Sequence, residues 1–131
     1  LHSFPTRRSS DLEGFTFFAE NEGIYAINCV EGKDRTGYVA ALLEALMGAD
    51  LDEIVDDYMI TFYNYYGVDR NDERYEIIAQ RNIIKTLEFA FETEDLASID
   101  LQAAACDYLK SIGLSEETIG KLQANLSVNH E

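Results

Sequence analysis

Residues 29–37 read Cys29-Val30-Glu31-Gly32-Lys33-Asp34-Arg35-Thr36-Gly37. Ile24 to Val30, an apolar run of β-branched character, overlaps the start of this stretch and predicts a buried strand. An amphipathic helical pattern follows it. A loop between a strand and a helix directs backbone N–H groups at one point, where the helix dipole adds positive potential. The stretch therefore predicts a phosphate-binding loop.

The residues of this loop suit nucleophilic chemistry on phosphorus. The positive field favours the thiolate of Cys29, which is the reactive form of the side chain. Arg35 can hold two phosphate oxygens through its planar guanidinium, and Thr36 can hydrogen-bond the Cys29 sulfur. A nucleotide P-loop is excluded, because Asp34 stands where Ser or Thr should follow the lysine. An inert core cysteine is the alternative for Cys29.

Five helical patterns follow the loop, and four of them have a start or stop signal. The first helix ends at Gly48 and has the apolar positions Val39, Leu42, Leu43, Leu46 and Met47. The second is capped by Asp50 and Glu53 and has the apolar face Leu51, Ile54, Val55, Tyr58, Met59 and Phe62. The third stretch covers 72–91, the fourth helix runs from Leu101 to Ile112 and is stopped by Gly113, and the fifth begins at Ser115, with Leu114 and Ile119 as a hydrophobic staple. A further helix end is expected over residues 15–20. One strand cannot form a sheet, so an α/β fold needs partner strands upstream.

The loop and two later segments resemble a known family. Asn28 to Gly37, NCVEGKDRTG, resembles the HCxxGKDRTG signature of the bacterial tyrosine phosphatase family that includes lipid-phosphatase-like, dual-specificity members. The segments EIVDDYMITFYNYYG (53–67) and YLKSIGLSEETIGKL (108–122) are similar to helices downstream of that loop. The resemblance covers about residues 13 to 127.

The resemblance implies an α/β, protein tyrosine phosphatase-like fold, of which this chain is the C-terminal part. It implies a phosphocysteine intermediate on Cys29, with Asp34 as general acid and Lys33 in contact with further anionic groups of the substrate. The phosphate would be held by main-chain amides of the loop: Val30, Glu31, Gly32, Lys33, Asp34, Arg35 and Thr36. The implied substrate is phosphotyrosine in a protein, with phosphoserine or a phosphoinositide also open, and no cofactor or metal is implied.

One position departs from the signature and keeps alternatives open. Asn28 stands where the family has a histidine that helps to sustain the thiolate. A non-catalytic, phosphate-binding pseudophosphatase is therefore a second hypothesis. A sulfur- or arsenate-handling enzyme is a third, which Lys33 and Asp34 disfavour. Asp34 itself has two other possible roles, as the cap of the next helix or as the ion-pair partner of Arg35.

Composition narrows the partners and the compartment. The formal net charge of −15 disfavours nucleic acid and anionic membrane as partners. No apolar run approaches the roughly 20 residues of a membrane helix. Two cysteines, Cys29 and Cys106, indicate a reduced, cytoplasmic setting. No residue grouping has metal-ligand spacing, and His130 is too close to the end for a Ser-His-Asp triad. The oligomeric state stays open.

The first twelve residues are interpreted as an artefact. HSFPTRRSSDL, residues 2–12, reads as a translation of a common short-read sequencing adapter. Residues 1–12 are therefore set apart, and residues 13–131 are taken as the C-terminal part of one phosphatase domain. We then expect the neighbours of the predicted strand to lie upstream of Glu13. We also expect the chain as written to be poorly active or inactive.

Three further groups of side chains receive structural interpretations. The aromatic residues 62–66 are assigned to the core, with a substrate cleft as the alternative. Cys106 is expected to be a small packing residue. The cations Arg70, Arg74, Arg81 and Lys85 are expected to face solvent, and a role in gating the substrate stays open for them.

Overall fold

The computed structural model describes residues 8–27 and 34–127, with side chains from residue 11 onward. The elements in chain order are α1 (Arg8–Glu20), α2 (Arg35–Leu46), α3 (Leu51–Tyr66), α4 (Tyr75–Ala79), the π-helix η2 (Gln80–Ile84), α5 (Lys85–Ala90), the 3-10 turn η3 (Leu96–Ser98), α6 (Leu101–Ser111) and α7 (Glu116–Ser127). Every regular element in this part of the chain is helical. None of these helices is both long enough and apolar enough to span a bilayer.

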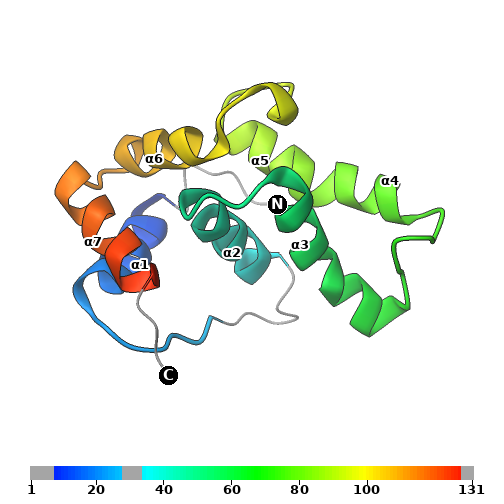
Figure 1. The fold of residues 1–131 in the computed structure, drawn as a ribbon, viewed down its shortest axis with the longest axis horizontal. Coiled ribbons are helices and arrows are strands. Elements are labelled where there is room, and N and C mark those ends of the chain that lie inside the picture. Colours follow the sequence, from blue (N-terminus) through cyan, green and yellow to red (C-terminus); the bar gives the residue numbers. More distant parts are fainter. Residues whose placement is uncertain (1–7, 28–33, 128–131) are drawn as a thin grey trace.

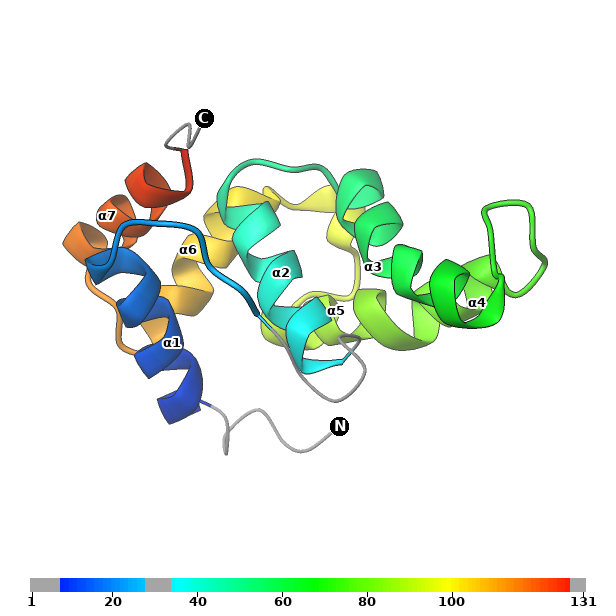
Figure 2. The same cartoon turned by 90° about the horizontal axis from the view of Figure 1, so that it is seen from below.

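Helix α2 lies at the centre of the arrangement (Figures 1 and 2). It packs against α6 on one side and α3 on another, while α1 lies along α7 at one end of the molecule. The elements α4, η2 and α5 follow one another without a break and contact α3 through α4 and η2. The start of α2 is therefore the place where elements distant in sequence converge.

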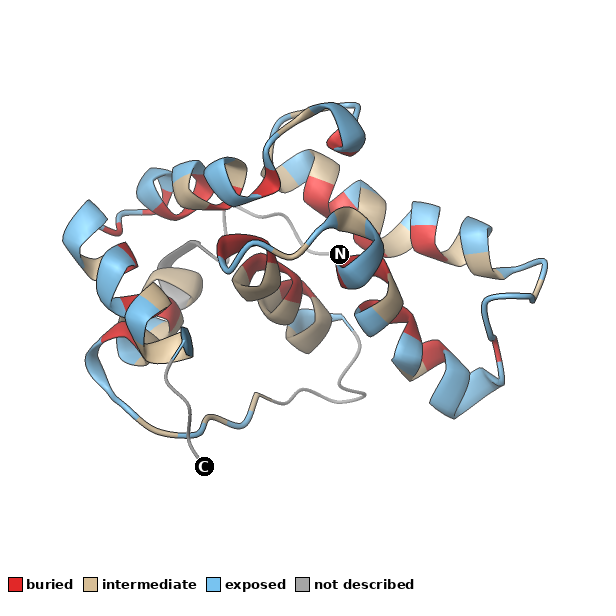
Figure 3. Cartoon of the chain, viewed as in Figure 1, coloured by how far each residue is buried: buried red, intermediate tan, exposed pale blue. Residues whose placement is uncertain are grey.

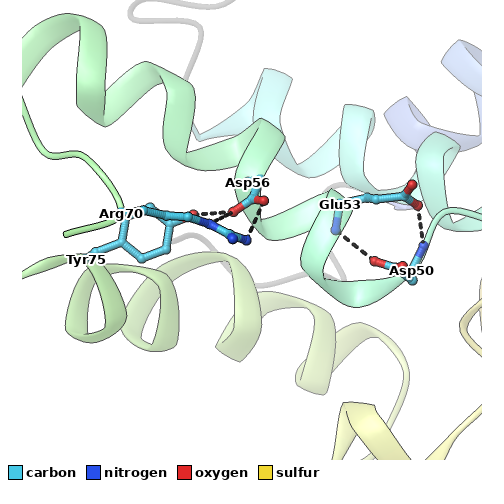
Figure 4. A network of polar contacts seen from close by, with 5 residues as sticks. All are labelled: Asp50, Glu53, Asp56, Arg70 and Tyr75. Atoms are coloured by element: carbon cyan, nitrogen blue, oxygen red, sulfur yellow. Dashed lines mark hydrogen bonds and ion pairs between the residues drawn. The ribbon is translucent and has the colours of Figure 1, made fainter. Parts of the chain in front are cut away.

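Buried side chains gather on the inward faces of these helices (Figure 3). In α3 the predicted apolar face is confirmed, because Ile54, Val55, Tyr58, Met59 and Phe62 are buried. The predicted capping box at its start is also confirmed (Figure 4). Asp50 Oδ1 accepts from the Glu53 amide at 2.9 Å, and Glu53 Oε2 accepts from the Asp50 amide at 2.8 Å.

The predicted face of α2 is partly wrong. Leu42 and Leu46 are buried as expected, but the remaining buried positions are Tyr38, Ala41 and Ala45 rather than Val39, Leu43 and Met47. Alanine has a small side chain, so the face that carries Ala41 and Ala45 lets a neighbouring helix approach closely. The helix is apolar on nearly all sides, and its sequence pattern alone does not decide which side faces the core.

The predicted stops and starts of the later helices are confirmed. Gly48 and Gly113 follow the ends of α2 and α6 with φ of 92° and 118°, a left-handed conformation that glycine adopts without strain. Ser115 Oγ accepts from the Thr118 amide at 3.1 Å at the start of α7. Leu114 and Ile119, the expected staple, are both buried.

The predicted strand is not confirmed. Residues 24–27 belong to neither helix nor strand, and Ile24 is 85% exposed, whereas residues 28–30 lie outside the described part. A strand is stable only when its backbone pairs with another strand, and the described residues supply no second strand. The α/β prediction therefore has no support from the described elements.

The third predicted helix, over 72–91, is confirmed for residues 75–90 and contains a π-helical turn that the sequence did not predict. The four cations of this region, Arg70, Arg74, Arg81 and Lys85, are exposed as expected. Two of them are ion-paired, Arg70 with Asp56 at 2.5 Å and Arg74 with Asp72 at 2.7 Å.

The helix expected over residues 15–20 is confirmed, and α1 also includes residues 8–12. Tyr108 Oη donates to Asp11 Oδ2 at 3.1 Å, and Leu12 lies against Gly113. Among the α1 side chains that the structure describes, from residue 11 onward, the buried ones are Phe15 and Ala19, both outside the segment interpreted as an adapter. The assignment of residues 1–12 to an artefact stays a prediction.

Candidate active site

The structure places the last part of the predicted loop at the start of α2. Asp34 is the residue before the helix, Arg35 is its first residue, and Thr36 and Gly37 complete its first turn. The other predicted site residues, Cys29, Val30, Glu31, Gly32 and Lys33, lie outside the described residues. The described part of the predicted loop is therefore the part that joins α2.

Among the described residues, no side chain caps the amides at the start of α2. The first N–H groups of any helix have no acceptor within the helix, and a capping side chain usually satisfies one of them. Asp34 occupies the capping position with helical φ and ψ of −79° and −70°, and its carboxylate accepts no such bond. These amides remain directed out of the helix, where they favour an anion.

Asp34 is also exposed, and within the described residues its carboxylate forms no ion pair with Arg35. Both structural alternatives for Asp34, as a helix cap and as the partner of Arg35, are thus absent from this part of the chain. Arg35 is exposed as well. A cation and a carboxyl group are therefore both open to solvent at the point where the predicted loop meets its helix.

Thr36 carries a buried hydroxyl. Its Oγ1 has no hydrogen-bond partner among the described residues. An unsatisfied buried hydroxyl costs roughly 1–3 kcal/mol, so such a group usually has a functional or an unobserved partner. The hydroxyl lies in the first turn of α2, next to the segment that carries Cys29.

The ring of Tyr58 on α3 packs against Gly37. A Cβ at position 37 would lie 2.8 Å from Cδ2 and Cε2 of this ring, which is closer than carbon atoms approach. Glycine is therefore what allows α3 to contact the first turn of α2. Burial, and secondly the negative charge of Asp34, raise the pKa of Tyr58 to about 12. The phenol consequently remains a hydrogen-bond donor at neutral pH.

A small cavity of about 20 Å³ lies beside this contact. It is lined by residues from α2, α3, η2 and α5: Asp34, Tyr38, Tyr58, Asn82, Ile83 and Thr86. Sequence reasoning assigned Tyr58 to the core and gave Asn82 and Thr86 no role. Only the folded arrangement brings them to Asp34, since 48 positions separate Asp34 from Asn82 in the chain.

The largest hollow of the described surface lies elsewhere. It measures about 960 Å³ and is bordered by α5 and α6. Its ionisable lining residues, apart from Tyr108, are all carboxylic acids: Glu88, Glu92, Glu94, Asp100 and Asp107. Neither Asp34, Arg35 nor Thr36 borders it. Repulsion between these carboxylates and a phosphate makes this hollow a poor candidate for the site, despite its size.

The aromatic residues at the end of α3 divide between core and surface. Phe62 is buried, but Tyr63, Tyr65 and Tyr66 are 58%, 62% and 52% exposed. Their assignment to the core is therefore wrong for the three tyrosines, which lie on the last turns of α3 and face solvent. The alternative assignment, as the lining of a substrate cleft, stays a prediction.

Two other sequence interpretations concern reactive side chains. Cys106 is partly buried and packs against the core, as expected of a small packing residue, and burial raises the pKa of its thiol. Among the described side chains, no group of three His, Cys, Asp or Glu residues is arranged to hold a metal ion.

Comparison with known proteins gives one family and two relatives. The profile described as the tyrosine phosphatase family matches residues 12–128. A tyrosine-protein phosphatase of Nostoc commune is 32% identical over 124 residues, which cover 82% of this chain and 40% of the relative. A putative tyrosine-protein phosphatase of Cupriavidus necator is 38% identical over 56 residues, or 43% of this chain and 20% of the relative. The chain thus spans less than half of either relative, and no solved structure matches it.

Proposed function

This chain belongs to the tyrosine phosphatase family, and from that premise we propose that it hydrolyses phosphate monoesters with Cys29 as nucleophile. The loop NCVEGKDRTG supports a place among the members with the HCxxGKDRTG signature, and with it the α/β fold of such phosphatases. The proposed substrate is phosphotyrosine in a protein, and the proposed setting is cytoplasmic. A phosphoinositide is the alternative substrate that Lys33 would favour.

The observation that carries the proposal is the arrangement at the start of α2. Within the described part of the chain, the helix amides have no side-chain cap, Arg35 and the Asp34 carboxyl group are exposed, and the buried Thr36 hydroxyl has no partner. Each of these groups has a role in phosphoryl transfer through a cysteine. A helix start that served only the fold would be expected to use Asp34 as its cap.

In the first step, the thiolate of Cys29 attacks phosphorus. The S–P bond forms as the bond between phosphorus and the leaving oxygen breaks, and Asp34 donates its proton to that oxygen. Arg35 binds two of the remaining oxygens, and the loop and helix amides bind the others. Donors that are held in place before the reaction stabilise the charge of the transition state without rearrangement.

In the second step, water attacks the phosphorus of the phosphocysteine. The O–P bond forms, the S–P bond breaks, and the Asp34 carboxylate takes the proton of the water. Cys29 leaves as a thiolate, and the Thr36 hydroxyl donates a hydrogen bond to its sulfur. The products are inorganic phosphate and the enzyme with Asp34 protonated again.

A second candidate function rests on Asn28. A neutral amide in place of the family's histidine supports the thiolate less well, which favours a protein that binds phosphate without turning it over. The two candidates differ in the turnover of the parent, because a phosphatase hydrolyses an aryl phosphate before any substitution and a binding module does not. We expect Asn28→His to raise the turnover of a phosphatase and to shift the acid side of its pH–rate profile.

The test of the proposed function is hydrolysis of a chromogenic aryl phosphate by a full-length form of the protein, which serves as the parent, since the match covers 40% of the Nostoc commune relative. Cys29→Ser should abolish turnover while the binding of inorganic phosphate persists, because serine stays protonated at neutral pH and the loop amides and Arg35 remain. Cys106→Ser is the matched control and should behave as the parent. Turnover that survives in Cys29→Ser would refute the cysteine mechanism.

A further inference from the structure

The cavity next to Asp34 has the size of one water molecule. A volume of roughly 10–15 Å³ is needed to hold a water, and this cavity measures about 20 Å³. The lining residues comprise Tyr38, Tyr58 and Ile83, whose side chains are largely apolar, and Asp34, Asn82 and Thr86, whose side chains are polar. A water needs two or more polar partners, which these residues can supply.

The orientation of Asn82, on the π-helix η2, is set by a hydrogen bond to the preceding helix α4. Asn82 Nδ2 donates a hydrogen bond of 2.7 Å to the carbonyl oxygen of Ile78, one turn earlier. Single π-helical turns within α-helices are rare and are frequent at functional sites. A side-chain amide has two N–H groups and one carbonyl oxygen, so Asn82 keeps hydrogen-bonding capacity beyond its bond to Ile78. The element η2 thus presents a fixed amide to the cavity.

A polar network holds η2 against α3 (Figure 4). Asp56 on α3 accepts from Tyr75 Oη at 2.6 Å and from Arg70 Nε at 3.0 Å. Tyr75 begins α4, which continues directly into η2. Val68, in the connection between α3 and α4, is buried and anchors it. These contacts fix the separation between Tyr58 on α3 and Asn82 on η2.

Resting on the proposed function, we propose that Asn82 is a positioning residue for Asp34, and that its amide and the Asp34 carboxylate share one water in this cavity. Asp34 is exposed and does not cap its own helix, so nothing in its local backbone fixes its carboxyl group. A water held by Asn82 limits that group to orientations on one side of the helix start. Asn82 itself touches neither the substrate nor the reacting atoms.

The test separates positioning from folding by two substitutions at one site. Asn82→Ala removes both the bond to Ile78 and the group in the cavity. Asn82→Ser restores only the hydrogen bond to Ile78, because a serine hydroxyl reaches the carbonyl four residues earlier but does not extend into the cavity. Gln80→Ala is the matched control, since Gln80 lies on the same π-helix, is exposed and does not line the cavity.

Both Asn82 variants should hydrolyse phenyl phosphate roughly tenfold more slowly than the parent, because a poor leaving group needs the proton of Asp34. With dinitrophenyl phosphate, whose leaving group needs no proton, they should be close to the parent. Gln80→Ala should match the parent on both substrates. An equal loss on both substrates, or full recovery in Asn82→Ser, would show a merely structural role and overturn the proposal.

A measurement without turnover keeps failure of this proposal distinct from failure of the proposed function. Magnetisation transfer from a long-lived water to the side-chain amide protons of Asn82 should be seen by NMR in the parent and should weaken in Asp34→Ala. No transfer in the parent would overturn the shared water whatever the activity. Transfer in a full-length parent that hydrolyses no aryl phosphate would sustain the shared water and refute both the proposed function and the positioning role.

Discussion

Asp34 stands where a carboxylate usually caps a helix, and it forms no cap. If it is the general acid, Asp34→Asn should slow the hydrolysis of phenyl phosphate by about 10²–10⁴-fold and that of dinitrophenyl phosphate far less. The α2 helix loses no capping bond in this variant, so its melting temperature should stay near that of the parent. A uniform loss over aryl phosphates of differing leaving-group acidity would count against Asp34 as the acid.

Gly37 is a residue whose missing side chain matters. In the interior of a helix, alanine is normally favoured over glycine by about 1 kcal/mol. Here the added Cβ would lie 2.8 Å from the Tyr58 ring, and such overpacking costs roughly 1–3 kcal/mol and displaces α3. We expect Gly37→Ala to melt at a lower temperature than the parent. In Gly120→Ala the added Cβ has no neighbouring atom within 4 Å, so this variant should melt at a slightly higher temperature. Stabilisation by both substitutions would refute the contact.

At the level of elements, local chemistry predicted the helices well. The capping box of Asp50 and Glu53 and the glycines after α2 and α6 act over a few residues, so they are visible in the sequence. The buried side of α2 was less predictable, because the helix is apolar nearly all round. The π-helix was not predicted, since it depends on how Tyr75 and the following residues dock on α3. The strand was not confirmed, since strands require partners distant in the chain.

The contact between α2 and α3 also contains a carboxyl pair that makes stability depend on pH. Burial, and then a hydrogen bond with Asp57, raise the pKa of Glu44 from 4.5 to about 8. The folded protein therefore keeps a proton that the unfolded chain releases. Stability from this group is fully present below pH 4.5 and is lost as the pH rises to about 8.

Glu44→Gln should remove this dependence, because glutamine stays neutral at every pH. We expect the variant to gain on the order of 1–2 kcal/mol over the parent at pH 9, after allowance for solvent screening, and little at pH 4. Denaturant unfolding at both values measures the difference. Glu94→Gln, at an exposed position, is the control, and its difference from the parent in the free energy of unfolding should be the same at pH 4 and pH 9. A gain that is equal at pH 4 and pH 9 would exclude the carboxyl pair as its cause.

At the level of the whole molecule, the buried anchors of α1 decide what its first residues contribute. Phe15 and Ala19 are 1% and 4% exposed, whereas Asp11 and Leu12 are only partly buried. A chain that begins at Glu13 should therefore keep a cooperative melt, and the loss of the Leu12 apolar contact and the Asp11 hydrogen bond should lower its free energy of unfolding by about 2 kcal/mol. Loss of cooperative unfolding would show that residues 1–12 are integral to the domain.

The sequence carried more information about the site's chemistry than about its surroundings. Residue types and spacing in 29–37 were enough to propose a nucleophile, an acid and a phosphate-binding arginine. They did not decide whether Asp34 is the cap of the next helix or the general acid, and only the helix geometry shows that it forms no cap. Tyr58 and Asn82 could not be assigned to the site, because a contact between α3, η2 and the start of α2 leaves no local pattern in a single sequence.

The central claim is that a phosphoryl group passes through Cys29, and its most direct test is to trap that intermediate. The protein is mixed with dinitrophenyl phosphate, quenched in acid within one turnover, digested and analysed by mass spectrometry. We predict one phosphoryl group on the peptide that contains Cys29, present in the parent and in Cys106→Ser and absent from Cys29→Ser. Turnover with an unmodified Cys29 peptide, or with the phosphoryl group on another residue, would contradict the mechanism.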